Sequence, residues 1–153
     1  MQQPGRIGPL RMKNRLIMAP MGTNFSTSDG ISTERDRAYY EERAKGGVAA
    51  IVTEAMAVSA GGRAHHNSLW IYHDRFIPGL ARLVEGIKRH DCVTVGQINH
   101  RGALLRRMVL NMEPVGPSPW RNPNTGDEVR PLDQEEITEI QKDFVAAARR
   151  LWQ

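Results

Sequence analysis

The sequence predicts an α/β fold built on a parallel sheet. Three short apolar runs, residues 16–19, 48–53 and 93–97, suit strands that are buried on both faces. Each run is followed by a segment with helix signals, and this alternation requires parallel strands joined by right-handed crossovers. The 153 residues suffice for one domain with its own core, and no linker divides them.

The chain begins with a predicted hairpin and then enters the first core strand. Residues 7–13 indicate two short strands around the turn dipeptide Gly8-Pro9. Pro20 ends the strand that follows, because proline has no amide to donate. Gly22 comes next and leaves the backbone open to a ligand.

Capping and spacing signals place three helices. Ser32 or Thr33 can cap the first helix, and the glycine pair at 46–47 ends it. The second helix covers residues 74–90, and the third begins at Asp133 with Glu136 completing a capping box. The apolar stripe of the second helix comprises Ile77, Leu80, Leu83, Val84 and Ile87, and that of the third comprises Ile137, Ile140, Phe144, Ala148 and Leu151.

The connections between these elements read as loops. Residues 54–73 form a polar loop after the second strand. Residues 101–131 form a long segment rich in Pro, Gly and Asn, and loops of this length are usually functional or mobile.

Composition narrows the class of protein. The N-terminus has no apolar signal segment and no run approaches membrane-spanning length, so we expect a cytoplasmic protein without membrane association. The single cysteine, Cys92, rules out an internal disulfide and is expected to be buried and inert. The charge of +4 comes from scattered arginines without interleaved aromatics, which indicates a solvated surface and no nucleic-acid partner.

Known nucleotide and metal motifs are absent from the sequence. No G-x-G-x-x-G follows a strand, and no G-x-x-x-x-G-K-[ST] occurs. The adjacent His65 and His66 point apart, so no metal site is expected.

Polar and small residues instead collect where the predicted strands end. The first strand leads into residues 20–23, the second into Glu54-Ala55, and the third ends at Gln97 with His100 close behind. The carboxyl ends of parallel strands share one rim, where ligands bind in α/β folds. The amide of Gln97 offers a donor beside an acceptor, which matches the O2 and N3–H edge of a flavin.

Several blocks together resemble the old yellow enzyme family of NADH:flavin oxidoreductases, 2,4-dienoyl-CoA reductases and enoate reductases. The resemblance covers nearly the whole chain. Its blocks are Ile7-Gly8 to Asn14-Arg15, Met18-Ala19-Pro20-Met21, Tyr39-Tyr40-x-x-Arg43-Ala44-x-Gly46-Gly47, Thr53-Glu54, Gln97-x-x-His100-x-Gly102, Pro117-Ser118-Pro119 and Glu135-Glu136-Ile137.

The resemblance implies a partial TIM (β/α)8 barrel, with residues 1–153 forming the N-terminal portion of an FMN-binding oxidoreductase domain. It implies FMN as cofactor, NAD(P)H as hydride donor and a small electron-poor alkene as substrate. His100 and Asn24 are expected near the substrate. The residues expected to bind the flavin are Ala19, Pro20, Met21, Gly22, Thr23, Ala55 and Gln97.

The sequence also departs from the family pattern. Relatives often carry Thr or Cys after the Pro-Met pair, where Gly22 stands here, and His-x-Gly-Arg where this chain has His100-Arg101-Gly102-Ala103. The proton donor, the substrate-anchoring His pair and the phosphate loops are expected beyond the C-terminus, so the isolated chain is expected to lack catalysis. Its open edges predict self-association or a complementing barrel fragment. The alternative is a non-catalytic remnant or binding module that keeps a partial barrel.

Overall fold

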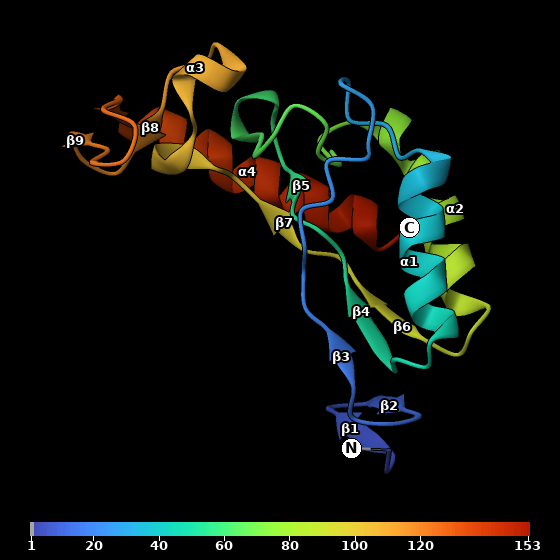
Figure 1. The fold of residues 1–153 in the computed structure, drawn as a ribbon. Helices are drawn as coiled ribbons and strands as arrows, with labels where there is room; N and C mark the ends of the chain where they lie inside the picture. Colours follow the sequence, from blue (N-terminus) through green and yellow to red (C-terminus); the bar gives the residue numbers. More distant parts are fainter. Residues whose placement is uncertain (1) are drawn as a thin grey trace.

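A parallel sheet covered on one side by two helices forms the centre of the molecule (Figure 1). The structure is a computed structural model that describes residues 2–153. The sheet has the order β3-β4-β6, and Ile17 pairs with Ala50, which pairs with Val93. The strands are β3 (Ile17–Met18), β4 (Ala50–Val52) and β6 (Val93–Val95), and the helices are α1 (Glu34–Lys45) and α2 (Ile77–Lys88). The predicted α/β class and parallel pairing are confirmed.

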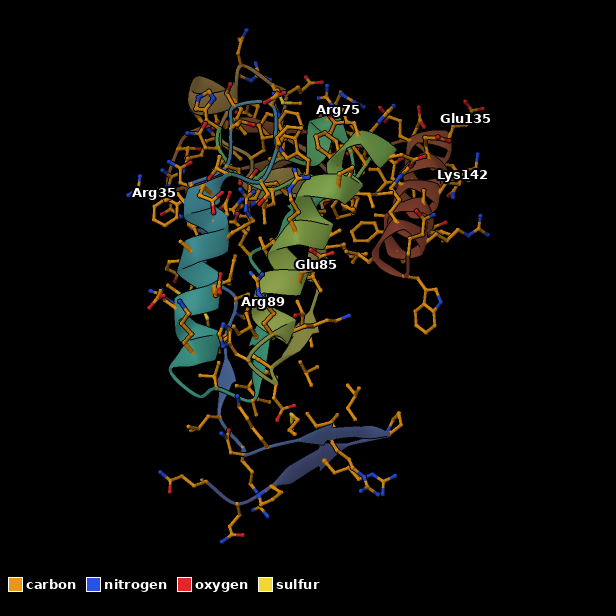
Figure 2. The ribbon with its side chains drawn as sticks, turned by 90° about the vertical axis from the view of Figure 1, so that its right-hand side faces the viewer. Arg35, Arg75, Glu85, Arg89, Glu135 and Lys142 are labelled. Carbon is orange, nitrogen blue, oxygen red and sulfur yellow. The ribbon has the colours of Figure 1, made fainter. Side chains whose placement is uncertain are left out.

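The N-terminal hairpin lies at the end of the sheet where its strands begin, as Figures 1 and 2 both show. β1 (Gly5–Ile7) and β2 (Leu10–Met12) pair antiparallel, as predicted from the Gly8-Pro9 turn. Met12 is buried and forms a small core cluster with Ala49, Ala50 and Val93. The hairpin is therefore anchored to the sheet by one of its two faces.

The parallel ladder continues beyond β4 and β6, which the sequence analysis missed. β5 (Met56–Ala57) pairs in parallel with β7 (Ile98–Asn99). The prediction of a polar loop over residues 54–73 is therefore wrong. The backbone amide of Ala57 donates to the Leu69 carbonyl at 3.0 Å, and that of Ile71 donates to the Ala57 carbonyl at 3.0 Å, so both apolar pieces of the segment enter the core.

The long segment 101–131 is also structured rather than irregular. Its turn-forming residues connect short elements, and its strands form a three-stranded sheet of order β8-β10-β9. The Arg130 guanidinium holds this sheet to α4 by pairing with Glu136, and it also pairs with Glu113. The elements are η3 (Gly102–Leu104), α3 (Arg107–Leu110), β8 (Val115–Gly116), β9 (Trp120–Arg121) and β10 (Glu128–Pro131).

The helix starts agree with the capping signals. Thr33 caps α1 and Asp133 caps α4 (Gln134–Leu151), each with a complete capping box. A short 3-10 turn, η2 (Asp74–Phe76), leads directly into α2, and a second, η1 (Ala60–Gly62), lies in the segment after β5. Among residues 2–153, none of the helices combines the length and apolarity that crossing a bilayer requires.

The predicted stripe of α4 needs correction at its C-terminal end. Ile137, Ile140 and Phe144 are half-buried, but Ala148 is exposed and Ala147 is the fully buried position. The buried face of α4 therefore continues from Phe144 to Ala147, three residues later, and not to Ala148. Leu151 is 38% exposed, although its Cδ atoms lie against Gly96.

The core lies between the sheet and helices α1 and α2, which pack side by side (Figure 2). Tyr40, Ile51, Leu83 and Ile87 are among its fully buried members, and Cys92 is buried as expected. The expectation that all three strands are buried on both faces is wrong. Ile17 is 46% exposed and Val95 is 42% exposed, because both lie on the face of the sheet that points away from α1 and α2.

Candidate functional site

A pocket of about 160 Å³ lies where β4 and β6 give way to β5 and β7. Three stretches distant in sequence meet there: the loop after β3, the loops on either side of β5, and the stretch around β7. The lining residues are Pro20, Gly22, Glu54, Ala55, Ala64, His65, Ser68, Gln97, Asn99 and Arg101.

The sheet ladder fixes the backbone of Gln97 from two sides. Its carbonyl accepts the Met56 amide at 2.8 Å, and its own amide donates to the Thr53 hydroxyl at 3.3 Å. Within residues 2–153 no hydrogen bond engages its side-chain amide. The position of this residue is therefore set by its backbone, while its side-chain donor and acceptor remain available to a ligand.

Glu54 is a buried carboxyl at the wall of the pocket, with only 1% of its surface exposed. Its Oε2 accepts the backbone amide of Thr23 at 2.7 Å, and its own amide donates to the Tyr40 hydroxyl at 2.8 Å. Oε1 is buried without a hydrogen-bond partner among the described residues. Glu54 therefore joins the loop after β3 to α1 and keeps one oxygen uncommitted.

A second buried carboxylate, Asp36, shapes the chemistry of Glu54. The Thr23 hydroxyl lies 3.2 Å from Asp36 Oδ1 and 3.3 Å from Glu54 Oε2, and its single proton can serve only one of them at a time. Burial, and then the charge of Asp36, raise the pKa of Glu54. Both effects make the charged form of Glu54 less favourable than that of an exposed glutamate. Burial likewise raises the pKa of Tyr40.

Further polar groups complete the wall of the pocket. An added Cβ at Gly22 would lie 3.4 Å from His65 Nε2, so the glycine leaves room for the imidazole. Burial, and then the charges of Arg101 and Arg106, lower the pKa of His65. Asn99 Oδ1 is buried without a partner among the described residues. An unpartnered buried carbonyl oxygen is costly unless a ligand or water satisfies it.

The structure brings some of the predicted site residues together and leaves others apart. Pro20, Gly22, Ala55 and Gln97 all line this pocket. They meet at the break between two pieces of the parallel ladder, not at its final end, because pairing resumes in β5 and β7.

The remaining predicted residues do not line the pocket. Ala19 is an exposed residue, and Met21 is 57% exposed. Thr23 directs its hydroxyl to the carboxylate pair, and Asn24 accepts the backbone amide of Asn67 at 3.2 Å. His100 packs on Gly62, where an added Cβ would lie 2.8 Å from its ring.

Sequence reasoning missed several lining residues. Asn99 could have been found, because side chains two apart on a strand share a face and Gln97 was already singled out. His65 and Ser68 carry no local signal, since the pairing of Ala57 with Leu69 and Trp70 brings their loop to the pocket. Arg101 was given no role, because this chain has His100-Arg101-Gly102-Ala103 where the family pattern has His-x-Gly-Arg. Within the described part of the chain, no group of His, Cys, Asp and Glu side chains could hold a metal ion.

The fold and the pocket define an α/β protein with a pocket of mostly polar lining at the carboxyl ends of β4 and β6. The chain belongs to the NADH:flavin oxidoreductase / NADH oxidase family, whose sequence model matches residues 1–153. This confirms the resemblance carried by the sequence blocks. Members of the family use FMN together with NADH or NADPH.

Two curated relatives and one solved structure illustrate the match. The NADPH dehydrogenase of Listeria monocytogenes is 34% identical over 146 residues, which are 95% of this chain and 42% of that protein. The NADH oxidase of Thermoanaerobacter brockii is 35% identical over 148 residues, 95% of this chain and 23% of that protein. The old yellow enzyme homologue from Zymomonas mobilis superposes with a TM-score of 0.88 at 26% identity, covering 97% of this chain and 44% of that one. The chain thus spans less than half the length of each.

Proposed function

We propose that residues 1–153 supply the first three βα units of an FMN-binding (β/α)8 barrel, in a protein that transfers hydride from NAD(P)H to an electron-poor alkene. Family membership and the parallel α/β architecture support this proposal. The observation that carries it is the convergence of Pro20, Gly22, Ala55 and Gln97 on one pocket.

The pocket has the groups that the edge of a flavin ring needs. The Gln97 amide can donate to a ring carbonyl and accept from the neighbouring N–H at once. Gly22 and Ala55 are small enough for a flat ring to approach the backbone. The unpartnered Oδ1 of Asn99 and the guanidinium of Arg101 add an acceptor and a donor at the same wall. When bound, FMN supplies the hydride chemistry, and these residues hold and orient it.

The size of the pocket supports a shared site. Complete small-molecule pockets usually hold about 300–1,000 Å³, whereas this one holds about 160 Å³. Residues 1–153 therefore form one wall of the proposed site. We place the phosphate loops, the proton donor and the substrate-binding His pair in the part of the barrel that this chain does not include.

A chimera tests the proposal in a complete barrel. Residues 1–153 replace the matched segment of the Listeria NADPH dehydrogenase, and bound FMN and NADPH oxidation are measured. Removing two neutral hydrogen bonds in Gln97→Ala costs about 1–3 kcal/mol, so FMN should bind roughly 5–150-fold more weakly. Gln141→Ala, which removes an exposed amide from α4, is the matched control and should leave binding unchanged. A folded chimera without flavin, or one indifferent to Gln97→Ala, contradicts the assignment.

The isolated chain provides a second measurement. Charge-assisted hydrogen bonds to the phosphate contribute roughly 1.5–3 kcal/mol each, and losing two or three weakens FMN binding by about 5 kcal/mol, or a few thousand-fold. The isolated chain should therefore bind FMN weakly and reduce no alkene. A sub-micromolar Kd in a fluorescence titration would show that residues 1–153 provide a phosphate site of their own.

A further inference from the structure

A side pocket of about 150 Å³ adjoins the candidate flavin pocket and shares part of its wall. Complete small-molecule sites usually hold about 300–1,000 Å³, so this space suits one end of a ligand and not a whole one. A molecule that lies in the flavin pocket can extend into the side pocket across the shared wall. Ala64, His65 and Arg101 line both pockets, and Arg106 and Leu110 complete the side pocket.

The backbone around β7 positions Arg101 at the shared wall. Gln97, Asn99 and Arg101 stand at every second position around this strand, and all three line the flavin pocket. The Arg101 amide donates to the Gly62 carbonyl at 3.0 Å, and its Nε donates to the Leu104 carbonyl at 3.3 Å. One of the five guanidinium N–H groups is thereby used, and the other four have no protein acceptor among the described residues.

Three basic side chains from different segments meet at the side pocket. Burial, and then the charges of Arg101 and Arg106, lower the pKa of His65, so both guanidinium groups lie close enough to act on its imidazole. Among the described residues, no aspartate or glutamate lines the side pocket. An anion in this space therefore meets positive charge from more than one side.

The carboxylates near α3 are engaged with other groups. Glu113 pairs with Arg107 at 3.6 Å, and Asp127 accepts the backbone amide of the same residue at 3.4 Å. Arg101 and Arg106 take part in none of the ion pairs between residues 2 and 153. The described part of the chain thus leaves the positive charge of the side pocket without a carboxylate partner.

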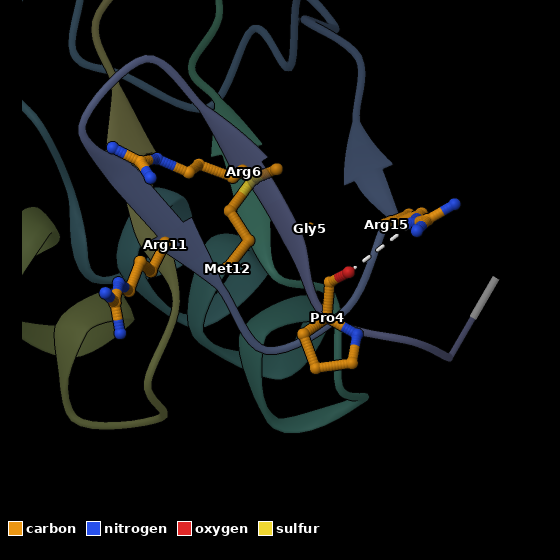
Figure 3. Close-up of a pocket in the computed structure, with 6 residues that line it drawn as sticks. All are labelled: Pro4, Gly5, Arg6, Arg11, Met12 and Arg15. Carbon is orange, nitrogen blue, oxygen red and sulfur yellow. Dashed lines mark hydrogen bonds between the residues drawn. The ribbon is translucent and has the colours of Figure 1, made fainter.

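A larger hollow of about 590 Å³ beside the N-terminal hairpin also carries arginines, but they do not converge (Figure 3). Arg6 and Arg11 are register partners on one face of the hairpin. Arg15 lies against the opposite face, with its Cγ 3.3 Å from a Cβ added at Gly5 and its Nε 3.4 Å from the Pro4 carbonyl. No single anion meets all three side chains, so this hollow lacks the arrangement that the side pocket has.

We propose that the side pocket binds an anionic group, a carboxylate or a phosphate, of the substrate that the flavin pocket serves. The inference rests on the proposed function and adds a substrate class to it: an alkene whose oxyanion is remote from the reacting double bond. Guanidinium groups form charge-assisted hydrogen bonds with carboxylate and phosphate oxygens. Gln97 and Ala55 line the flavin pocket but not the side pocket. The anion is therefore a second group of the substrate, distinct from the group that activates the alkene.

The imidazole of His65 reports on an anion in the side pocket without any need for FMN. Its pKa is measured by NMR in residues 1–153, and His65→Gln assigns its resonance among the five histidines. Butyrate or butyl phosphate should raise the pKa of His65 relative to sodium chloride of equal ionic strength, because a nearby anion favours the imidazolium. Neutral butyramide should leave it unchanged. If only one of the two anions acts, it identifies the bound group as a carboxylate or a phosphate.

Replacement of the two arginines tests whether they hold the anion. Arg101→Gln/Arg106→Gln should raise the pKa of His65 without any ligand, because two nearby positive charges are removed. It should also weaken anion binding roughly tenfold or more, since charge-assisted hydrogen bonds are lost. Arg149→Gln, which removes an exposed arginine from α4, is the matched control and should change neither value. A His65 pKa that neither anion moves, or that moves equally in the double variant, overturns the proposal.

The chimera with the Listeria NADPH dehydrogenase distinguishes this inference from the proposed function. Its substrates are an enone with a carboxylate two methylenes from the double bond and the methyl ester of the same enone. Arg101→Gln should lower kcat/KM for the acid roughly tenfold relative to the ester, mainly through KM, whereas Arg149→Gln should leave this ratio unchanged. A chimera that reduces neither compound contradicts the proposed function. A chimera that reduces both, with a ratio indifferent to Arg101→Gln, contradicts the anion subsite alone.

Discussion

Replacement of Gly30 by alanine is the sharpest test of how the loops around the candidate flavin pocket are held. Gly30 is buried with φ of +80°, and an added Cβ would lie 2.1 Å from Cδ2 of Trp70. The Gly30 carbonyl also accepts the Trp70 amide at 3.3 Å. This contact joins the loop after β3 to the loop before α2, and both loops contribute residues to the pocket.

The cost has two sources that a control can separate. A left-handed backbone costs a non-glycine residue roughly 1–2 kcal/mol, and overpacking against a buried ring costs about 1–3 kcal/mol. Reduced entropy of the unfolded chain returns about 0.4–1 kcal/mol. We expect Gly30→Ala to lower the free energy of unfolding by about 1.5–4 kcal/mol. Gly126→Ala has a similar φ of +74° but no atom within 4 Å of the added Cβ, so it isolates the backbone cost.

Urea unfolding followed by far-UV circular dichroism provides the measurement. With an m value of about 1–3 kcal/mol/M, a clash of this size should shift the Gly30→Ala midpoint by about 1 M relative to Gly126→Ala. In the Trp70→Leu background the two glycine substitutions should cost nearly the same, because the ring that causes the clash is gone. Equal midpoints for Gly30→Ala and Gly126→Ala in the unmodified background would refute the reasoning.

Three further predictions concern pH, capping and association. Because the pKa of Glu54 is raised in the folded state, its contribution to stability is present below the ordinary glutamate pKa and is lost as pH rises through the folded value. The urea midpoint of Glu54→Gln should therefore fall less between pH 4.5 and 7.5 than that of the unmodified chain. Parallel pH profiles of the two proteins would contradict this. Thr33→Ala removes the acceptor of the α1 capping box and should cost about 0.5–2 kcal/mol in urea unfolding, with Thr33→Ser restoring most of it. The double substitution Ile17→Lys/Val95→Lys, on the edge strands β3 and β6, should reduce self-association measured by light scattering. Val145→Lys, on the exposed face of α4, should leave self-association unchanged. If the double substitution leaves it unchanged as well, the chain associates through another surface.

Local signals carried the parts of the fold that depend on short stretches of sequence. Asp133 was recognisable as a cap because Glu136 stands three positions later, whereas Ser32 and Thr33 were both candidates for α1 and the structure selects Thr33. The three core strands were recognisable because β-branched and apolar residues run together between turn signals. Their parallel order followed from the helices between them.

The parts that were missed depend on pairing between distant residues. β5 and β7 have two residues each, which is too short for any periodic pattern. The burial of residues 56–58 arises from contacts with residues 69–71, across a stretch that reads as polar. The small sheet in 101–131 was hidden for a similar reason, because its turn residues outnumber its strand residues.

The candidate flavin pocket shows the same division. Ala55 and Gln97 were predicted together because strand ends of a parallel sheet share a rim, and this depends only on topology. His65 enters because the Gly30–Trp70 contact and the Ala57–Leu69 pairing position its loop, and neither is visible in a one-dimensional pattern. Thr23 does not line the pocket, because its hydroxyl lies between the carboxylates of Asp36 and Glu54.

The N-terminal hairpin shows why the net charge alone was uninformative. A value of +4 can result from evenly mixed charges or from one uncompensated cluster, and in the sequence a turn separates Arg6 from Arg11. Only the hairpin register places them opposite each other on one face. The like-charge pair in β1 and β2 is unfavourable by itself, and this cost becomes visible only once the pairing of the two strands is known.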